Sequence, residues 1–252
     1  MGIFGTYSDS SSNDVASYLT KTPYEKFQRI ADPGAQATIV TAVAAREVAA
    51  VVFNPPQLPG IWSFVRIDGA WELVKSRREG MEILGVNDSL IAVGFYLSRS
   101  NAMVPFELNL KTNRLRRLHP PNSVSGEAAG INDEDDVVGS FTAPSGGMHG
   151  FFLRSGSYHE FSYPSASSTQ ANGLNARDQV AGQYVDSGGV THGFILTDPA
   201  APPASRMWQS IDEPNAAALT VVNAIDGRDE LCGWYVDGND AVHGFVATPK
   251  RG

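Results

Sequence analysis

Three of the five histidines of this chain occur in the same tripeptide, His-Gly-Phe, at His149, His192 and His243. Neutral imidazole is a common metal ligand, so three identical histidine motifs raise the question of a zinc site. Zinc requires its ligand nitrogens at about 2.0–2.1 Å. Whether these histidines can meet in this way depends on the elements that carry them.

Each His-Gly-Phe tripeptide ends a longer repeated pattern. A Gly-x-aromatic tripeptide precedes it, at 139–141, 182–184 and 233–235, and a segment of small residues that ends in Asn or Asp comes before that. A weaker copy covers 84–106, and fainter ones lie at 61–65 and 15–19. The matching aromatic residues recur at a spacing in the forties, which is typical of one four-stranded propeller blade; they are Tyr18, Phe64, Phe106, Phe151, Phe194 and Phe245.

The composition within each repeat indicates strands. Short segments rich in β-branched and aromatic residues alternate with turns of Gly, Asn, Asp, Pro and Ser. We interpret the alanine-rich segment 37–50 as a strand pair as well. The sequence therefore predicts an all-β fold: a single β-propeller domain over 1–252, built of repeated four-stranded antiparallel blades. The predicted units lie near 1–35, 36–80, 81–125, 126–168, 169–218 and 219–252.

The number of blades has two interpretations. The favoured one is six blades, two of them incomplete, because the middle hairpin occurs six times. The alternative is five blades, in which the segment 24–30 pairs with the C-terminal strands and residues 1–22 form an additional hairpin.

The repeated sequence motifs over 128–250, and more weakly over 83–110, resemble the HAF repeats of bacterial proteins. This resemblance implies a bacterial β-propeller-like repeat protein. It implies no particular activity, because structural motifs define that family.

The composition excludes several classes of protein. With 42% hydrophobic and 18% charged residues the chain is typical of a soluble globular protein, and its net charge of −8 gives no basic surface for nucleic acid or an anionic membrane. The N-terminus lacks the features of a signal peptide, so we expect a cytoplasmic location, with a trimmed secreted form left open. The single cysteine, Cys232, excludes an intrachain disulfide and is expected to be a buried structural thiol.

The repeat pattern also predicts the role of the His-Gly-Phe histidines. They occupy the same place in three successive blades, each roughly 10 Å outside the innermost strand, so they cannot converge on one zinc ion. We therefore expect them to be mostly buried and bonded within their blades, to neighbouring backbone, and we expect no metal and no cofactor. By the same logic Asn or Asp closes the first turn of each repeat, at Asn87, Asn132, Asn175 and Asp226, and the turn residues Asp135, Asp178 and Asp229 are expected to adopt a left-handed conformation.

Candidate functional residues occur where the copies differ. Three positions before the glycine of the first strand, the repeats carry Glu82, Glu127, Gln170 and Val221. In a propeller this position lies near one mouth of the central channel, so we expect Glu82 and Glu127 side by side, with Gln170 next. Close carboxylates shift one another's pKa apart and can act as an acid and a base. The alternative is two solvated glutamates.

The connections between blades supply further candidates. His119 lies in one of them and is the third candidate for acid/base catalysis. Arg77, Arg78 and Arg116 could bind a carboxylate or phosphate of a ligand, or simply pair with glutamates. Trp62 takes the place of a His-Gly-Phe histidine and is a candidate ligand contact or an ordinary core residue.

Three functions remain open. The leading hypothesis is a propeller that binds a small molecule or peptide at one mouth of its channel. The alternative is a metal-independent acid/base enzyme at the same rim, such as an isomerase, cyclase, lyase or glycoside hydrolase. The weaker alternative is a protein-interaction scaffold. Binding is favoured because the chain has no phosphate-cradling glycine motif, nucleophile elbow or His-Glu-x-x-His motif.

Overall fold

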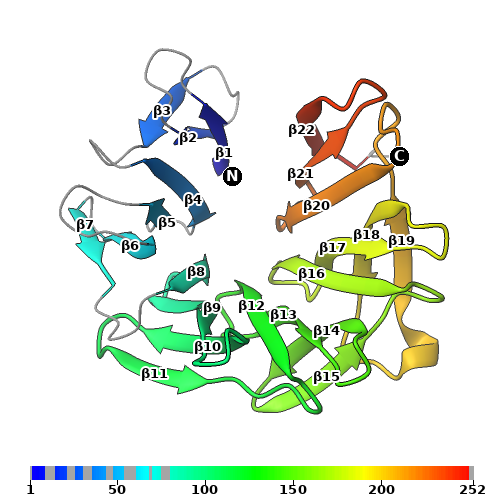
Figure 1. Cartoon of the computed structure of the whole chain (residues 1–252), viewed down its shortest axis with the longest axis horizontal. Coiled ribbons are helices and arrows are strands. Elements are labelled where there is room, and N and C mark those ends of the chain that lie inside the picture. The colour runs from blue at the N-terminus through cyan, green and yellow to red at the C-terminus, as the bar shows by residue number, and fades with distance from the viewer. Residues whose placement is uncertain are drawn as a thin grey trace. The chain divides into compact units, whose positions relative to one another are not determined.

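The computed structural model describes residues 2–8, 15–21, 26–30, 36–43, 48–53, 61–67, 70–74 and 80–249. They form two compact units, Met1–Leu118 and His119–Gly252, each of which is described by itself. The fold is all-β, as predicted: the described residues contain strands and one short 3₁₀ helix, η1 (Pro203–Ser205). Among them no helix has the length and apolar character needed to cross a membrane. Figure 1 labels the strands in chain order.

The first unit contains strands β1 to β11. Strands β1, β2 and β4–β7 follow one another in a single sheet, in which β3 pairs with β2, and β8–β11 form a four-stranded antiparallel sheet. The strands are β1 (Gly2–Ser8), β2 (Val15–Lys21), β3 (Phe27–Ile30), β4 (Ala37–Val43), β5 (Val48–Phe53), β6 (Ile61–Ile67), β7 (Ala70–Leu73), β8 (Met81–Val86), β9 (Ile91–Leu97), β10 (Met103–Asn109) and β11 (Arg114–Arg117).

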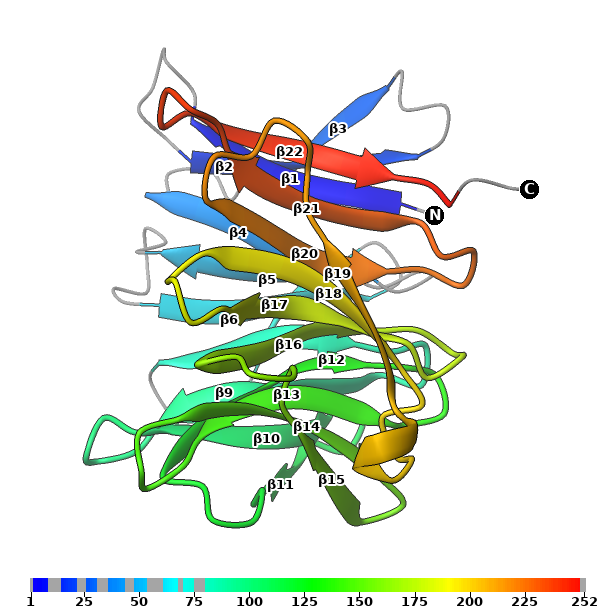
Figure 2. The same cartoon turned by 90° about the vertical axis from the view of Figure 1, so that its right-hand side faces the viewer.

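The second unit contains strands β12 to β22, coloured green to red in Figure 2. Consecutive strands pair antiparallel within each repeat, and a single parallel contact joins the third strand of one repeat to the first strand of the next. The strands are β12 (Ser125–Ile131), β13 (Val137–Thr142), β14 (Met148–Arg154), β15 (Ser157–Phe161), β16 (Ser168–Leu174), β17 (Val180–Val185), β18 (Thr191–Thr197), β19 (Met207–Ile211), β20 (Leu219–Ile225), β21 (Leu231–Val236) and β22 (Val242–Ala247).

The register between the second and third strands is the same in every repeat. The repeated aromatic residue always lies opposite a glycine or alanine, in the pairs Gly5↔Tyr18, Ala50↔Phe64, Gly94↔Phe106, Gly139↔Phe151, Gly182↔Phe194 and Gly233↔Phe245. The predicted strand pair over 37–50 is also present, as β4 and β5. The first strands β4, β8, β12, β16 and β20 each carry a bulge two or three residues before their ends.

The turns between the first and second strands close as predicted. The side-chain oxygen of the Asn or Asp accepts the backbone N–H groups two and four residues further on, at Asn87, Asn132, Asn175 and Asp226. Asp135, Asp178 and Asp229 have φ values of 63°, 59° and 64°. Asp186 and Asp237 close the next turns with the same pair of bonds, which assigns the segments 186–189 and 237–240 a turn-forming role.

Charged side chains tie neighbouring repeats of the second unit together. Arg154 on β14 donates to the buried Asp136 of its own repeat, with Nη2–Oδ2 at 2.6 Å, and also pairs with Asp178 of the next repeat. Arg177 pairs with Asp229 one repeat further on. Each ion pair therefore links the first turn of one repeat to that of the following one.

Glycine is required in the second strands β13, β17 and β21, because a carbonyl oxygen and an aromatic ring both approach it there, whereas β5 carries Ala50 at the equivalent position. A Cβ atom built on Gly182 would lie 2.1 Å from the Gln170 carbonyl oxygen and 2.8 Å from the ring of Phe194. A Cβ atom on Gly139 would meet the Glu127 carbonyl oxygen and the ring of Phe151. A Cβ atom on Gly233 would likewise meet the Val221 carbonyl oxygen and the ring of Phe245. The first-strand carbonyl and the third-strand ring thus leave no room for a side chain.

We predict that Gly182→Ala lowers the free energy of unfolding by about 1–3 kcal/mol, because neither the backbone carbonyl nor the buried ring can move away without strain. Urea unfolding followed by circular dichroism measures this change. Gly227→Ala is the matched control, since a Cβ at Gly227 has no neighbour within 4 Å, and its effect should stay within about 0.5 kcal/mol. Equal effects of the two substitutions would contradict this account.

Candidate functional site

A chain of three polar side chains crosses neighbouring first strands of the second unit. Glu127 on β12 and Gln170 on β16 occupy the same register position, opposite Ser140 and Gln183, and the two strands are in contact. Gln170 Nε2 donates to Glu127 Oε1 at 2.8 Å, and Gln183 Nε2 donates to Gln170 Oε1 at 3.1 Å. The structure therefore brings two of the predicted site residues together.

The raised pKa of Glu127 distinguishes this cluster from the equivalent positions of other repeats. Burial raises the pKa of Glu127 above its ordinary value of 4.5, and the hydrogen bond from Gln170 only partly opposes this rise. A raised pKa means that the protein environment disfavours the ionised carboxylate. The repeat does not require an acid at this position, because β4 and β20 carry Ile39 and Val221 there.

The other predicted rim residues lie in the first unit or outside the described residues. Glu82 on β8 lies opposite Phe95, at the position equivalent to Glu127. The prediction that Glu82 lies next to Glu127 concerns two residues of different units, each described by itself, and it stays a prediction. Arg77 and Arg78 lie outside the described residues. Trp62 on β6 is half-buried and lies two residues before Phe64, where other repeats carry the His-Gly-Phe histidine.

Arg116 was predicted in a connection between blades, and this is wrong. It belongs to the fourth strand β11, where its guanidinium pairs with Glu107 of β10 across the antiparallel ladder. The sequence around Arg116 alternates poorly between polar and apolar residues, so its strand character was hidden. His119 does lie in the connection that follows; its side chain is exposed, and its backbone N–H donates to Tyr158 Oη at 2.8 Å.

The His-Gly-Phe histidines are bonded within their own repeats, as predicted, but to side chains rather than to backbone. His149 and His192 are mostly buried, whereas the prediction of burial is wrong for His243. Their side chains are 28%, 20% and 44% exposed at His149, His192 and His243. They bond to the side chains of Ser162, Asp212 and Asp237 respectively. Each ring also packs on the aromatic residue of the second strand, with centroid distances of 5.6, 4.9 and 5.1 Å.

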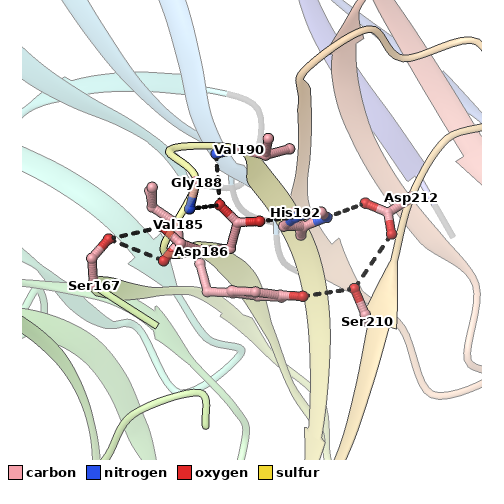
Figure 3. Close-up of polar contacts among 9 residues, drawn as sticks. Ser167, Val185, Asp186, Gly188, Val190, His192, Ser210 and Asp212 are labelled. Carbon is pink, nitrogen blue, oxygen red and sulfur yellow. Dashed lines mark hydrogen bonds and ion pairs between the residues drawn. The ribbon is translucent and has the colours of Figure 1, made fainter. Parts of the chain in front are cut away.

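His192 has the most extensive of these networks, drawn in Figure 3. Its Nδ1 donates to Asp212 Oδ1 at 2.6 Å, and its Nε2 lies 3.5 Å from Asp186 Oδ2. Asp212 also accepts from Ser210 Oγ at 3.4 Å. Burial lowers the pKa of His192, but the bond and charge of Asp212, followed by those of Asp186, outweigh this effect and raise it above 6.5.

These networks hold the outer strands together. Asp186 also closes its own turn through Gly188 and Val190, so the carboxylate beside His192 has a backbone role. The bond from His243 holds the pKa of Asp237 at about 2. Within the part of the chain that the structure describes, no group of three or more His, Cys, Asp or Glu residues is arranged to hold a metal ion.

Two further residues escaped the sequence analysis. Gln183, the middle residue of the second Gly-x-aromatic tripeptide, completes the chain of polar side chains. The sequence feature that could have identified it is its difference from Ser140 and Trp234, which occupy this position in the other copies. Asp212 follows β19, and no repeated sequence motif includes it. Cys232 is half-buried rather than buried, and burial raises the pKa of its thiol, which lowers its fraction of reactive thiolate.

No family model and no curated protein matches this chain. Among solved structures it is similar to TolB from Acinetobacter baumannii, with a TM-score of 0.67 and 14% identity over 100% of this chain. The chain spans 64% of the length of that protein. A putative TolB from Agrobacterium tumefaciens gives a TM-score of 0.60 at 7% identity, covering 99% of this chain and 91% of the other.

A third similar structure is the β-propeller domain of the Trilobed protease from Pyrococcus furiosus. Its TM-score is 0.56 at 10% identity, covering 99% of this chain and 78% of that one. At these identities the similarity extends to the fold alone, and that fold is the β-propeller.

We predict that Glu127→Gln does not destabilise the protein at pH 7. The amide oxygen of glutamine can still accept from Gln170, and the penalty for a buried carboxylate is removed. Because the folded-state pKa is raised, the wild type should lose stability relative to the variant as the pH rises from about 4.5 through that pKa. Urea unfolding from pH 4 to 8 measures the difference; a variant that is less stable at pH 7 would contradict the prediction.

We predict the same direction of pH dependence for His192. A raised folded-state pKa means that the stability contributed by the charged ring is complete below the ordinary value of 6.5 and disappears as the pH rises through the raised value. The difference in unfolding free energy between wild type and His192→Gln should therefore be larger at pH 5.5 than at pH 8.5. An equal difference at the two pH values would contradict this prediction.

Proposed function

We propose that this protein is a β-propeller binding module. It holds a small polar molecule or a peptide beside the first strands β12 and β16, and Glu127, Gln170 and Gln183 supply the polar contacts. In a propeller the first strand of each blade lines the central channel, so these side chains face one mouth of that channel.

The raised pKa of Glu127 carries this proposal. An ionised carboxylate at a site whose burial disfavours it weakens the fold. Equivalent positions in other repeats show that an apolar residue satisfies the architecture, as Val221 does with only 4% exposure. A residue that reduces stability without a structural need is typical of a functional site.

The chemistry of the cluster indicates the kind of ligand. Glu127 can only accept hydrogen bonds when ionised, whereas each glutamine offers both donors and acceptors. Gln170 already donates to Glu127 and accepts from Gln183, which orients its amide. The cluster therefore favours ligands that carry hydroxyl or amine donors, and the overall charge of −8 disfavours anionic ones.

We also propose that the chain consists of six repeats of the kind that resembles HAF repeats, because the middle hairpin occurs six times. The common register of the six aromatic residues supports this count. On this interpretation β1–β3 and β20–β22 are three-stranded among the described residues, and four repeats have four strands. The location remains a proposal as well, and we favour the cytoplasm.

An acid/base enzyme is the second candidate, and the same observation supports it. A carboxyl group with a raised pKa is protonated over a wider pH range, which favours a role as a general acid. Chemical conversion of a bound probe by the wild type, lost in Glu127→Gln while binding is retained, would favour the enzyme over the binding module.

We predict that saturation-transfer NMR against hexoses, amino sugars, polyamines and tripeptides detects at least one class that binds the wild type. Glu127→Gln or Gln170→Ala should weaken that binding about 10- to 100-fold, because a hydrogen bond to a charged group is lost or its acceptor is misplaced. Glu134→Gln is the matched control, since Glu134 is exposed in the neighbouring turn. Binding that all three variants retain would place the ligand elsewhere and refute the proposal.

A further inference from the structure

The fourth strand of each repeat follows a register rule. A bulky side chain lies opposite the residue two positions after the repeated aromatic of the third strand. Leu115 lies opposite Leu108, Tyr158 opposite Leu153, and Trp208 opposite Leu196. In the sheet of β6 and β7 the residue at this position is Trp71, opposite Arg66.

This bulky residue covers the preceding repeat. The ring of Trp208 on β19 lies 6.0 Å from Phe161, at the end of the preceding fourth strand β15, and 5.1 Å from Tyr163. It also contacts Phe194 of its own third strand at 5.2 Å. As a result Phe161 is only 2% exposed. The fourth strand therefore completes its own sheet and covers the outer strand of the repeat before it.

Strand β22 lacks such a neighbour within the described residues, where the strand order ends at its outer edge. The consequences appear on both sides of this edge. Phe245 is half-buried, although Phe106, Phe151 and Phe194 are 0–1% exposed. On β19, Ile211 occupies the position of Phe161 but is only half-buried, and Met207 is 60% exposed.

A groove of about 600 Å³ occupies the place where a fourth strand would lie. Its walls are the face of β18 and β19 on one side and the ends of β21 and β22 on the other, all drawn in yellow to red in Figure 2. The apolar part of the lining includes Ile195, Met207, Ile211, Leu231 and Ala247. Ala247 stands where three other repeats carry leucine, which leaves additional room opposite it.

The backbone of β22 offers hydrogen bonds toward this groove. In the sheets that have a fourth strand, the residue before the repeated aromatic points its carbonyl outward: Leu118 N–H donates to the Pro105 oxygen at 2.9 Å, and Val74 N–H donates to the Ser63 oxygen at 3.0 Å. Gly244 holds this position in β22. Because successive residues of a strand alternate in direction, the N–H and C=O groups of Gly244 and Val246 point away from β21.

We propose that β22 is the docking edge for an extended peptide segment of a partner protein. The segment adds to β22 as an antiparallel fourth strand and places an aromatic or large aliphatic side chain opposite Ala247, over Ile211. Main-chain bonds to Gly244 and Val246 give affinity, and the apolar groove selects the side chain. The register of the fourth strands β7, β11, β15 and β19 argues for this occupant, since it specifies both the strand direction and the bulky residue. The proposal does not depend on the cluster at Glu127.

The probe that tests this is a fluorescent synthetic peptide with the sequence of residues 205–213, the strand that pairs with β18 in this chain. We predict that it binds the full-length protein in a fluorescence anisotropy titration. Replacing its tryptophan by alanine should weaken binding about tenfold or more, because the groove loses its main apolar contact.

Val246→Pro in the protein should weaken binding about tenfold, because proline removes the outward N–H group. Proline is tolerated on edge strands, and β10 already carries Pro105 two positions before Glu107, the residue equivalent to Val246. Val246→Ala is the matched control, which keeps that N–H and should bind like the wild type. Circular dichroism reports whether each variant is folded.

Hydrogen exchange of the wild type provides a second measurement that needs no variant. The amides of Gly244 and Val246 should exchange rapidly in the free protein and become protected when the peptide is added. Three results would overturn the proposal: no peptide binding, protection of these amides before peptide is added, or a concentration-dependent dimer in which β22 pairs with a second copy. Sedimentation velocity distinguishes the last of these.

Discussion

The close approach of a backbone carbonyl and an aromatic ring to one glycine is the constraint on which the repeats of the second unit depend. The second-strand glycine faces a first-strand carbonyl oxygen, and the ring of the third-strand phenylalanine lies over it. This contact involves all three strands of a repeat at once and therefore restricts their register. A side chain at that glycine would force the strands apart, and the repeats could then not pack on one another.

Because this architecture is repeated, departures from it are informative. Glu127 lies where other repeats tolerate isoleucine or valine, and its raised pKa shows that the fold disfavours its ionised form. Phe245 and Ile211 are less buried than their counterparts, and this marks the outer edge of β22 as incomplete within the described residues. The two proposed sites thus rest on different observations. One is the raised pKa of Glu127, and the other is the incomplete burial of Phe245 and Ile211 beside β22.

The His-Gly-Phe histidines show the opposite case, in which a chemically suggestive residue serves the architecture. Each ring stacks on its own second strand and bonds to a nearby serine or aspartate of its own repeat. The partners differ from repeat to repeat although the histidine does not. The ring position is therefore set by stacking. At His192 the polar partner Asp212 also raises the pKa of the ring against the effect of burial.

The sequence by itself determined the all-β fold, the shared register of the aromatic residues and the turn roles of Asn132, Asn175 and Asp226, because local hydrogen bonding and the alternation of strands depend on neighbours in the chain. It also indicated Glu127 and Gln170 through their equivalent positions. Only the tertiary structure decided that Gln183 joins them, that Asp212 bonds to His192, that Arg116 lies in a strand, and that a groove lies beside β22. Those contacts join residues far apart in sequence, and their burial depends on which neighbouring strand is present to cover them.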